Sequence, residues 1–358
     1  MNNLFRSIFV LFAFMCASQG VAGSTPQTPQ DYKLGVYYFP GWKNDSEGLQ
    51  SNKPWEKIKP FPGREPMLGW YEEGKVDVAE QQLQWMQSYG IDFVIYDWYW
   101  SANNRPLLEH AVSAYLQAPS RSKVQFSVLW ANHSLVPTSL SQFEQIVRYW
   151  VKNYFSHQEY VTEDGKPVVY IFSPDQLEIN ANKFGMTTQD LLGAARQIAK
   201  SSGLQGIYFV GNSATGWGSR GPAKRGYDAL TGYVYRNGFS GQKEPRPENY
   251  TQMDASYRRT WQWILEHLDI PYFPPVVFGW NHTPWGITES GDDCCVSTPE
   301  TFRQHLQAAR KMVDAYPDKT KKTVVICCWN EYGEGNYIEP TKKNGFEFLE
   351  QINAVFGK

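Results

Sequence analysis

Two glutamates near the C-terminal end of the sequence have the residue type and spacing needed for acid–base chemistry. Glu331 and Glu334 stand three positions apart, directly after the apolar run 323–328. Such a run is typical of a buried strand, and Gly333 and Gly335 allow a tight turn that brings the two side chains together. Glycosidic bond cleavage uses such a pair, because one carboxyl donates a proton while the other acts as base or nucleophile. The spacing alone is only moderately specific, and the position after a buried strand adds most of the weight.

The elements that must position this pair alternate between strand-like and helix-like segments. Eight apolar runs are predicted to be strands: 34–39, 93–96, 124–129, 168–172, 207–210, 229–234, 276–278 and 323–328. Most are continuously apolar, as expected for parallel strands covered on both faces. Helical spacing of apolar residues is visible in 76–86, 143–151, 191–198 and 302–312. Thr298 and Pro299 predict the start of the last of these helices.

Eight strand–helix units predict an α/β fold, a (β/α)8 TIM barrel in a single domain. A doubly wound open sheet is the runner-up. That fold would carry a glycine-rich phosphate loop after an early strand, and the sequence has none.

The residues that follow the apolar runs are candidates for substrate binding, because active sites of such barrels lie at the C-terminal ends of the strands. Aromatic rings there can stack on sugar faces, while amides and acids bind sugar hydroxyls. Each residue also has a structural alternative, such as capping a helix or packing the barrel end. The candidates are Tyr38, Trp42, Asp97, Trp98, Trp100, Trp130, Asn132, His133, Tyr235, Trp280, Asn281, His282, Asn330 and Tyr332.

Charge and the N-terminal segment limit the partners and the compartment. The net charge of −2 argues against nucleic acid, and no basic run suggests a membrane surface. Residues 1–23 are predicted to be a secretory signal peptide, because a basic start precedes a short apolar stretch and small residues. Residues 24–358 are then an exported catalytic domain, periplasmic or extracellular, without a membrane span and expected to be a monomer. Lipid attachment at Cys16 is the alternative, although Met15 is a poor residue to precede such a cysteine.

Four cysteines remain after the signal peptide, in the vicinal pairs Cys294–Cys295 and Cys327–Cys328. Adjacent cysteines rarely bond each other without strain. Free or buried thiols, a disulfide between the two pairs and a metal site are the alternatives. The absence of CxxC-type spacing with histidines argues against the metal. No metal and no cofactor are predicted.

Several of these motifs together resemble the WbsX-type proteins, which are similar to glycoside hydrolase family 99. CWNEYGEGNYIEP (328–340) is the most specific of them. The others are GVYYFPGW (35–42), YGIDFVIYDWYW (89–100), FSVLWANHS (126–134), GKPVVYIFSP (165–174) and VVFGWNHTPW (276–285). The resemblance covers nearly all of the chain after the signal peptide.

The resemblance implies a (β/α)8 barrel and a retaining glycoside hydrolase that acts on α-linked glycans, such as α-mannosides or α-rhamnosides. Carried over, Glu331 is the base that takes a proton from the sugar 2-hydroxyl, which then attacks the anomeric carbon to form a 1,2-anhydro sugar. Glu334 is the acid that protonates the leaving oxygen and then activates water. The chain departs from the family's pattern at His133, where relatives often have Glu, and at Tyr332, where Trp is commoner.

Two other functions stay open: a carbohydrate-binding pseudoenzyme, and a transglycosylase or transferase in surface-polysaccharide assembly. A transferase that uses nucleotide sugars should show a DxD motif or a glycine-rich phosphate loop, and the sequence has neither.

Overall fold

Eight parallel strands form the centre of the molecule, and each coincides with one of the eight predicted runs. The computed structural model describes residues 32–47, 52–235, 239–240, 245, 247–286 and 295–357. The strands are β1 (Lys33–Tyr38), β2 (Phe93–Trp100), β4 (Gln125–Trp130), β6 (Lys166–Ile171), β7 (Tyr208–Asn212), β8 (Ala229–Thr231), β9 (Pro275–Val277) and β12 (Thr323–Cys327). The short strands β3 (Pro106–Leu107) and β5 (Thr162–Glu163) pair antiparallel with β2 and β6.

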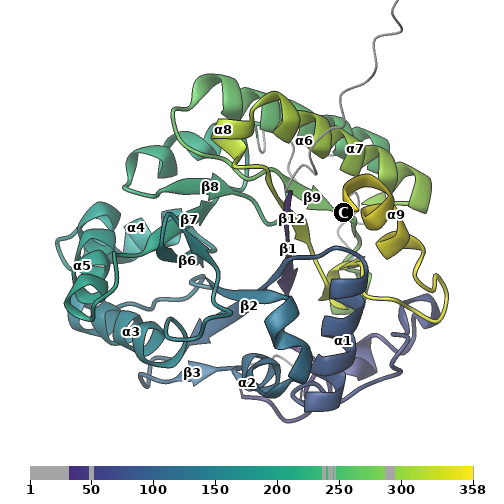
Figure 1. Cartoon of the computed structure of the whole chain (residues 1–358), viewed down its shortest axis with the longest axis horizontal. Helices are drawn as coiled ribbons and strands as arrows, with labels where there is room; N and C mark the ends of the chain where they lie inside the picture. Colours follow the sequence, from purple (N-terminus) through teal and green to yellow (C-terminus); the bar gives the residue numbers. More distant parts are fainter. Residues whose placement is uncertain are drawn as a thin grey trace, which may run out of the picture. The chain divides into compact units, whose positions relative to one another are not determined.

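The strand order β8-β7-β6-β4-β2-β1-β12-β9 brings the first and last of these strands side by side. β1 and β12 pair in parallel from Lys33 opposite Thr323 to Val36 opposite Ile326. At the ends of this order, β8 and β9 are linked through an isolated bridge between Leu230 and Tyr272. The sheet is therefore nearly closed into a ring with helices outside it (Figure 1), and the predicted (β/α)8 TIM barrel is confirmed.

Helices alternate with these strands along the chain and surround the sheet in Figure 1. They are α1 (Val76–Ser88), α2 (His110–Gln117), α3 (Leu140–Asn153), α4 (Pro174–Lys183), α5 (Thr188–Ser201), α6 (Tyr250–His267), α7 (Pro299–Ala315), α8 (Pro317–Thr320) and α9 (Glu347–Phe356). The predicted start of α7 is confirmed, because the Thr298 side chain accepts from the Thr301 backbone N–H and Pro299 occupies the first turn.

Successive residues of β2 face two different cores. On β2, Phe93 and Ile95 belong to the cluster inside the barrel. Val94, Tyr96 and Trp98 belong to the larger cluster that contains the helix residues. This follows from the two-residue period of a strand, and it decides which strand-end side chains can reach a site at the mouth of the barrel.

The Cys327–Cys328 pair differs from its prediction. The two residues are joined to each other by a disulfide bond, so neither free thiols nor a bond between the two pairs describes them. Their Cα atoms lie 2.9 Å apart, and both side chains are fully buried in the cluster inside the barrel. Cys295 is also disulfide-bonded, and its neighbour Cys294 lies outside the described residues.

Residues 31–358 form one compact unit. Within the described ranges, no helix combines the length and apolar character that a membrane span requires. The predicted signal peptide at residues 1–23, with Cys16, lies outside the described residues.

Candidate active site

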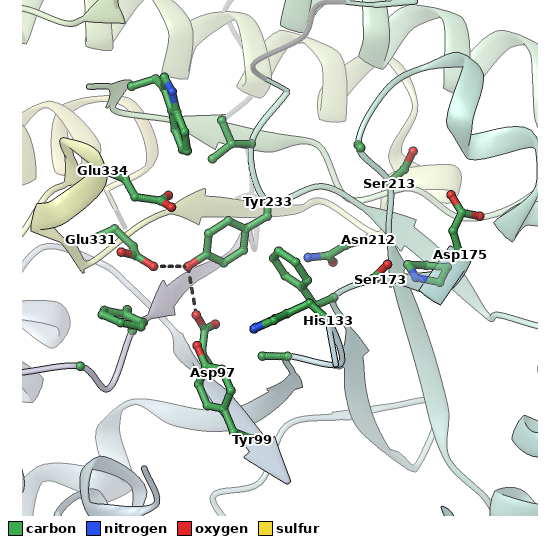
Figure 2. Close-up of a pocket in the computed structure, with 18 of the residues that line it drawn as sticks. Asp97, Tyr99, His133, Ser173, Asp175, Asn212, Ser213, Tyr233, Glu331 and Glu334 are labelled. Carbon is green, nitrogen blue, oxygen red and sulfur yellow. Dashed lines mark hydrogen bonds between the residues drawn. The ribbon is translucent and has the colours of Figure 1, made fainter. Parts of the chain in front are cut away.

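A cavity of about 770 Å³ lies where the barrel strands end (Figure 2). Its lining comes from segments at or after the C-terminal ends of the strands, as the fold predicts. The described side chains around it include Phe39, Asp97, Tyr99, His133, Phe172, Ser173, Asp175, Asn212, Ser213, Thr215, Tyr233, Trp280, Trp285, Glu331 and Glu334. Aromatic rings and hydrogen-bonding groups are thus mixed in one concave site of a size suited to a small ligand or part of a glycan.

The two glutamates enter this cavity from a tight turn after β12. Glu331 ends the short strand β13 (Asn330–Glu331), and Glu334 ends the 3-10 turn η8 (Tyr332–Glu334). Gly335 closes the turn with a left-handed backbone (φ +64°), and a Cβ atom there would lie 2.8 Å from the Asn281 carbonyl oxygen. Only glycine fits this position easily. The turn places both carboxyl groups on the same side of the cavity (Figure 2).

A tyrosine hydroxyl links Glu331 to a third carboxyl group. Tyr233 Oη lies 3.2 Å from Glu331 Oε1 and 3.1 Å from Asp97 Oδ2. Asp97 lies on β2, and Tyr233 follows β8, so these contacts cross the mouth of the barrel. Asp97 and Glu331 are each only 6% exposed, which removes most of the solvation that an ionised carboxylate needs.

Burial makes the carboxyl groups hard to ionise together. It is the main cause that raises the pKa of Asp97 well above its ordinary value, and the charge of Glu334 adds to it. Burial, followed by the charges of Glu334 and Asp97, likewise raises the pKa of Glu331. Burial lowers the pKa of His133, which favours the neutral imidazole. The site therefore holds at least one carboxyl proton more readily than a solvent-exposed cluster would.

A buried hydrogen-bond network holds the turn that carries Glu331 and Glu334 (residues 330–335, the glutamate turn) against the end of β1. Asn330 Nδ2 donates to the Phe39 carbonyl and Asn330 Oδ1 accepts from the Phe39 N–H, both at 2.9 Å. Trp42 Nε1 donates to the Asn330 carbonyl at 2.9 Å. The Tyr332 hydroxyl donates to Glu339 Oε2 at 2.8 Å. Asn330, Trp42 and Tyr332 therefore fix the turn from behind.

The predicted site residues divide into two groups. Asp97, His133, Trp280, Glu331 and Glu334 line the cavity. The remaining candidates do not line it: Tyr38, Trp42, Trp98, Trp100, Trp130, Asn132, Tyr235, Asn281, His282, Asn330 and Tyr332.

Strand alternation and local hydrogen bonds account for much of this second group. Trp98 lies between Asp97 and Tyr99, points to the opposite face of β2 and donates to the Tyr154 hydroxyl at 2.9 Å. Asn132 is fully buried and bonds the backbone N–H and carbonyl of Ser173. These side chains pack the barrel end and position neighbouring loops.

Several lining residues were absent from the predicted site. Tyr233 lies inside the predicted strand 229–234, whereas β8 ends at Thr231, so the predicted strand end falls beyond it. Tyr99 stands two positions after Asp97, and the period of a strand places it on the same face. Trp285 contributes from the short turn η7 (Thr283–Trp285), for which no apolar run gave a signal.

Fold and cavity together define a (β/α)8 barrel with an acidic cavity at the C-terminal ends of its strands. A protein described as "Glycoside hydrolase-like protein" superposes with a TM-score of 0.67 at 17% identity, covering 92% of this chain and 95% of the other. The GH99 endo-alpha-mannosidase of Bacteroides thetaiotaomicron, in complex with bis-tris-propane, superposes with a TM-score of 0.66 at 15% identity, covering 91% and 96%. At these identities the likeness concerns the fold.

The chain belongs to the family described as "Glycosyltransferase WbsX", whose family model matches residues 62–352. It is also 20% identical over 333 residues to "Uncharacterized protein WxcX" of Xanthomonas campestris pv. campestris, covering 87% of this chain and 45% of that protein. The chain thus spans about half the length of this curated relative.

Proposed function

We propose that this protein is a glycoside hydrolase that cleaves an α-linked glycan with Glu331 and Glu334 as its catalytic pair. One observation carries the proposal. Two carboxyl groups from a single turn face a 770 Å³ cavity at the catalytic end of a (β/α)8 barrel, among aromatic rings that suit sugar faces. The predicted signal sequence at residues 1–23 supports action outside the cytoplasm.

The two glutamates have different surroundings, and the difference supports different roles. Glu331 is buried and bonded through Oε1 to the Tyr233 hydroxyl, so its second oxygen serves a substrate hydroxyl. Glu334 is half-buried at the end of η8, where it can exchange protons with a leaving oxygen or with water. In this assignment Glu331 takes the proton of the sugar 2-hydroxyl, the 2-oxygen attacks the anomeric carbon, and Glu334 protonates the departing oxygen. Water then opens the 1,2-anhydro ring, which gives overall retention.

An α-mannoside or α-rhamnoside fits this route, because the 2-hydroxyl must lie trans to the leaving group. In an α-manno configuration the 2-hydroxyl and the aglycone lie on opposite faces of the ring. The polar groups of Ser173, Asn212 and Ser213 then provide partners for hydroxyls of a neighbouring sugar residue.

A transferase is the second candidate, because the matching family is described as glycosyltransferase. Among the described lining residues none is lysine or arginine, whereas Asp97, Glu331 and Glu334 are acidic. The negatively charged diphosphate of a nucleotide sugar would be repelled by carboxylates in this part of the cavity. Transfer from a glycan donor to an acceptor sugar is compatible with the same pair of glutamates.

The test is hydrolysis of a panel of α-mannan and α-rhamnan oligosaccharides by the wild type and by Glu334→Gln. We expect the variant to lose about 10²- to 10⁴-fold in kcat, because general acid–base catalysis contributes that much. Glu266→Gln, on the exposed face of α6, is the matched control. Wild-type turnover by Glu334→Gln would refute the acid assignment. Product analysis with an added acceptor sugar separates hydrolysis from transfer.

A further inference from the structure

A single hydroxyl group stands between two buried carboxyl groups in the cavity. Tyr233 Oη lies 3.1 Å from Asp97 Oδ2 and 3.2 Å from Glu331 Oε1, as the dashed lines in Figure 2 show. Asp97 and Glu331 are both buried, so water screens their interaction little. The three groups form a continuous chain from β2 through the segment after β8 to β13.

The number of hydrogens in this chain limits its protonation state. A tyrosine hydroxyl has one hydrogen to donate, and an ionised carboxylate only accepts. With both carboxyls ionised, Tyr233 donates its hydrogen to one carboxylate. The contacting oxygen of the other carboxylate then faces the lone pairs of the Tyr233 hydroxyl, which is repulsive. With one carboxyl protonated, that carboxyl donates to Tyr233 and Tyr233 donates to the other. Both contacts are hydrogen bonds only in the second arrangement.

Asp97 is the better place for the proton. Its second oxygen, Oδ1, is buried without a hydrogen-bond partner among the described residues, whereas neither oxygen of Glu331 is in that situation. An anionic oxygen without a partner costs far more in a buried site than a neutral carbonyl oxygen does. Burial and the charge of Glu334 raise the pKa of Asp97. Similar causes raise the pKa of Glu331. The buried Oδ1 without a hydrogen-bond partner therefore decides that Asp97, rather than Glu331, carries the proton.

We propose that Asp97 is a positioning residue that keeps this proton, donates it in a hydrogen bond to Tyr233, and through Tyr233 holds Glu331 ionised. The inference rests on the proposed function, in which Glu331 is the base. The Tyr233 hydrogen then points at Glu331 Oε1 and leaves Oε2 for the sugar 2-hydroxyl. The proton of Asp97 stays in place during the reaction, and the sugar proton goes to Glu331.

Titratable groups face Asp97 from several elements: Tyr37 of β1, Tyr99 of β2, His133 after β4, Tyr233 after β8, and Glu331 and Glu334 after β12. Burial raises the pKa of the three tyrosines and lowers the pKa of His133. These four groups are therefore neutral near pH 7. The pH dependence of this cluster comes from its three carboxyl groups.

The protonation state can be measured without substrate, by infrared difference spectroscopy between the wild type and Asp97→Asn at pH 7. We expect the difference spectrum to contain the C=O stretch of one protonated carboxylic acid, which the wild type has and the variant has lost. Glu347→Gln, exposed at the start of α9, should lose carboxylate bands instead. Carboxylate bands in the Asp97→Asn difference would overturn the proposal, whether or not the protein hydrolyses any glycan. This readout therefore separates a failure of the inference from a failure of the proposed hydrolase function.

Tyr233→Phe gives a second infrared measurement should Asp97→Asn fold poorly. It leaves both carboxyl groups in place and removes the acceptor of the Asp97 hydrogen. We expect the protonated C=O band to shift in frequency, because the Asp97 hydroxyl loses its hydrogen bond. A difference spectrum with carboxylate bands alone would overturn the proposal.

Kinetics on any glycan that the wild type cleaves provide a rescue test. Asp97→Ala should lose about a hundredfold in kcat, comparable to the removal of one preorganised donor. Asp97→Asn should recover roughly tenfold of that loss, because its amide donates to Tyr233 and cannot ionise. Equal losses in both variants would contradict the positioning role.

Discussion

Glu339 is a buried carboxyl group behind the site, and its titration should make the protein less stable as the pH rises. It is 2% exposed and accepts hydrogen bonds from Tyr71 Oη, Tyr332 Oη and Gln82 Nε2 at 2.8 to 2.9 Å. Burial is the largest cause that raises its pKa from 4.5 to about 7. The three hydrogen bonds oppose this rise and leave burial dominant.

The sign and size of the effect follow from proton linkage. Below pH 4.5 the carboxyl is protonated in both states and contributes no pH dependence. Between pH 4.5 and 7 the folded state keeps a proton that the unfolded state has released, so the free energy of unfolding falls as the pH rises. A shift from 4.5 to about 7 corresponds to about 3 kcal/mol. Above pH 7 the full loss is present.

Glu339→Gln removes this titration while preserving the shape of the side chain. Its amide oxygen still accepts from Tyr71 and Tyr332, and a flipped Gln82 amide can accept from the new Nε2. We expect the unfolding free energy of the variant, relative to wild type, to rise by about 3 kcal/mol between pH 5 and pH 8. Urea unfolding at several pH values measures this difference, and the titrations of Asp97 and Glu331 cancel in it.

The matched control is Glu347→Gln, an exposed carboxyl on α9. Its difference from wild type should change little over the same pH range. A pH-independent difference for Glu339→Gln would show that Glu339 is ionised as easily in the folded state as in the unfolded state, which would refute the reasoning.

Two further substitutions test the packing around the site. Gly333→Ala should lower kcat/KM, because a Cβ atom at this position would lie 2.0 Å from Trp285 Cε2 and displace that lining ring. Gly193→Ala on α5 is the control, because a Cβ atom there would have nothing within 4 Å. Unchanged kinetics in Gly333→Ala would contradict this. Trp98→Ala should cost about 4 kcal/mol of stability in denaturant unfolding, because Trp98 is 1% exposed and bonded to Tyr154. A loss under 1 kcal/mol would argue against its packing role.

The sequence was sufficient to predict the barrel, because continuous apolar runs mark parallel strands wherever both faces are covered. Because both faces of such a strand are apolar, the sequence does not indicate which face points into the barrel. On β2, Asp97 and Tyr99 reach the cavity while Trp98 and Trp100 pack outward, and both sets consist of large residues. The choice depends on register around the ring, which requires all eight strands at once.

Site residues on irregular segments are harder to predict from sequence than those on strands. Trp285 reaches the cavity from η7, and Tyr233 from a segment that follows a strand of three residues. The sequence did not predict the Cys327–Cys328 bond, because adjacent cysteines rarely bond each other without strain. Glu331 and Glu334 were easier to recognise, because one short motif contains both.

The two hydrogen bonds between Phe39 and Asn330 join positions that are 291 residues apart. It continues the pairing of β1 with β12. A ribosome therefore releases β1 long before its partner exists, and during that interval one edge of β1 is open to pairing with other chains. The glutamate turn is assembled at the end of the same delay. Until β12 has been synthesised, keeping β1 apart from neighbouring chains is therefore a condition for the barrel to close correctly.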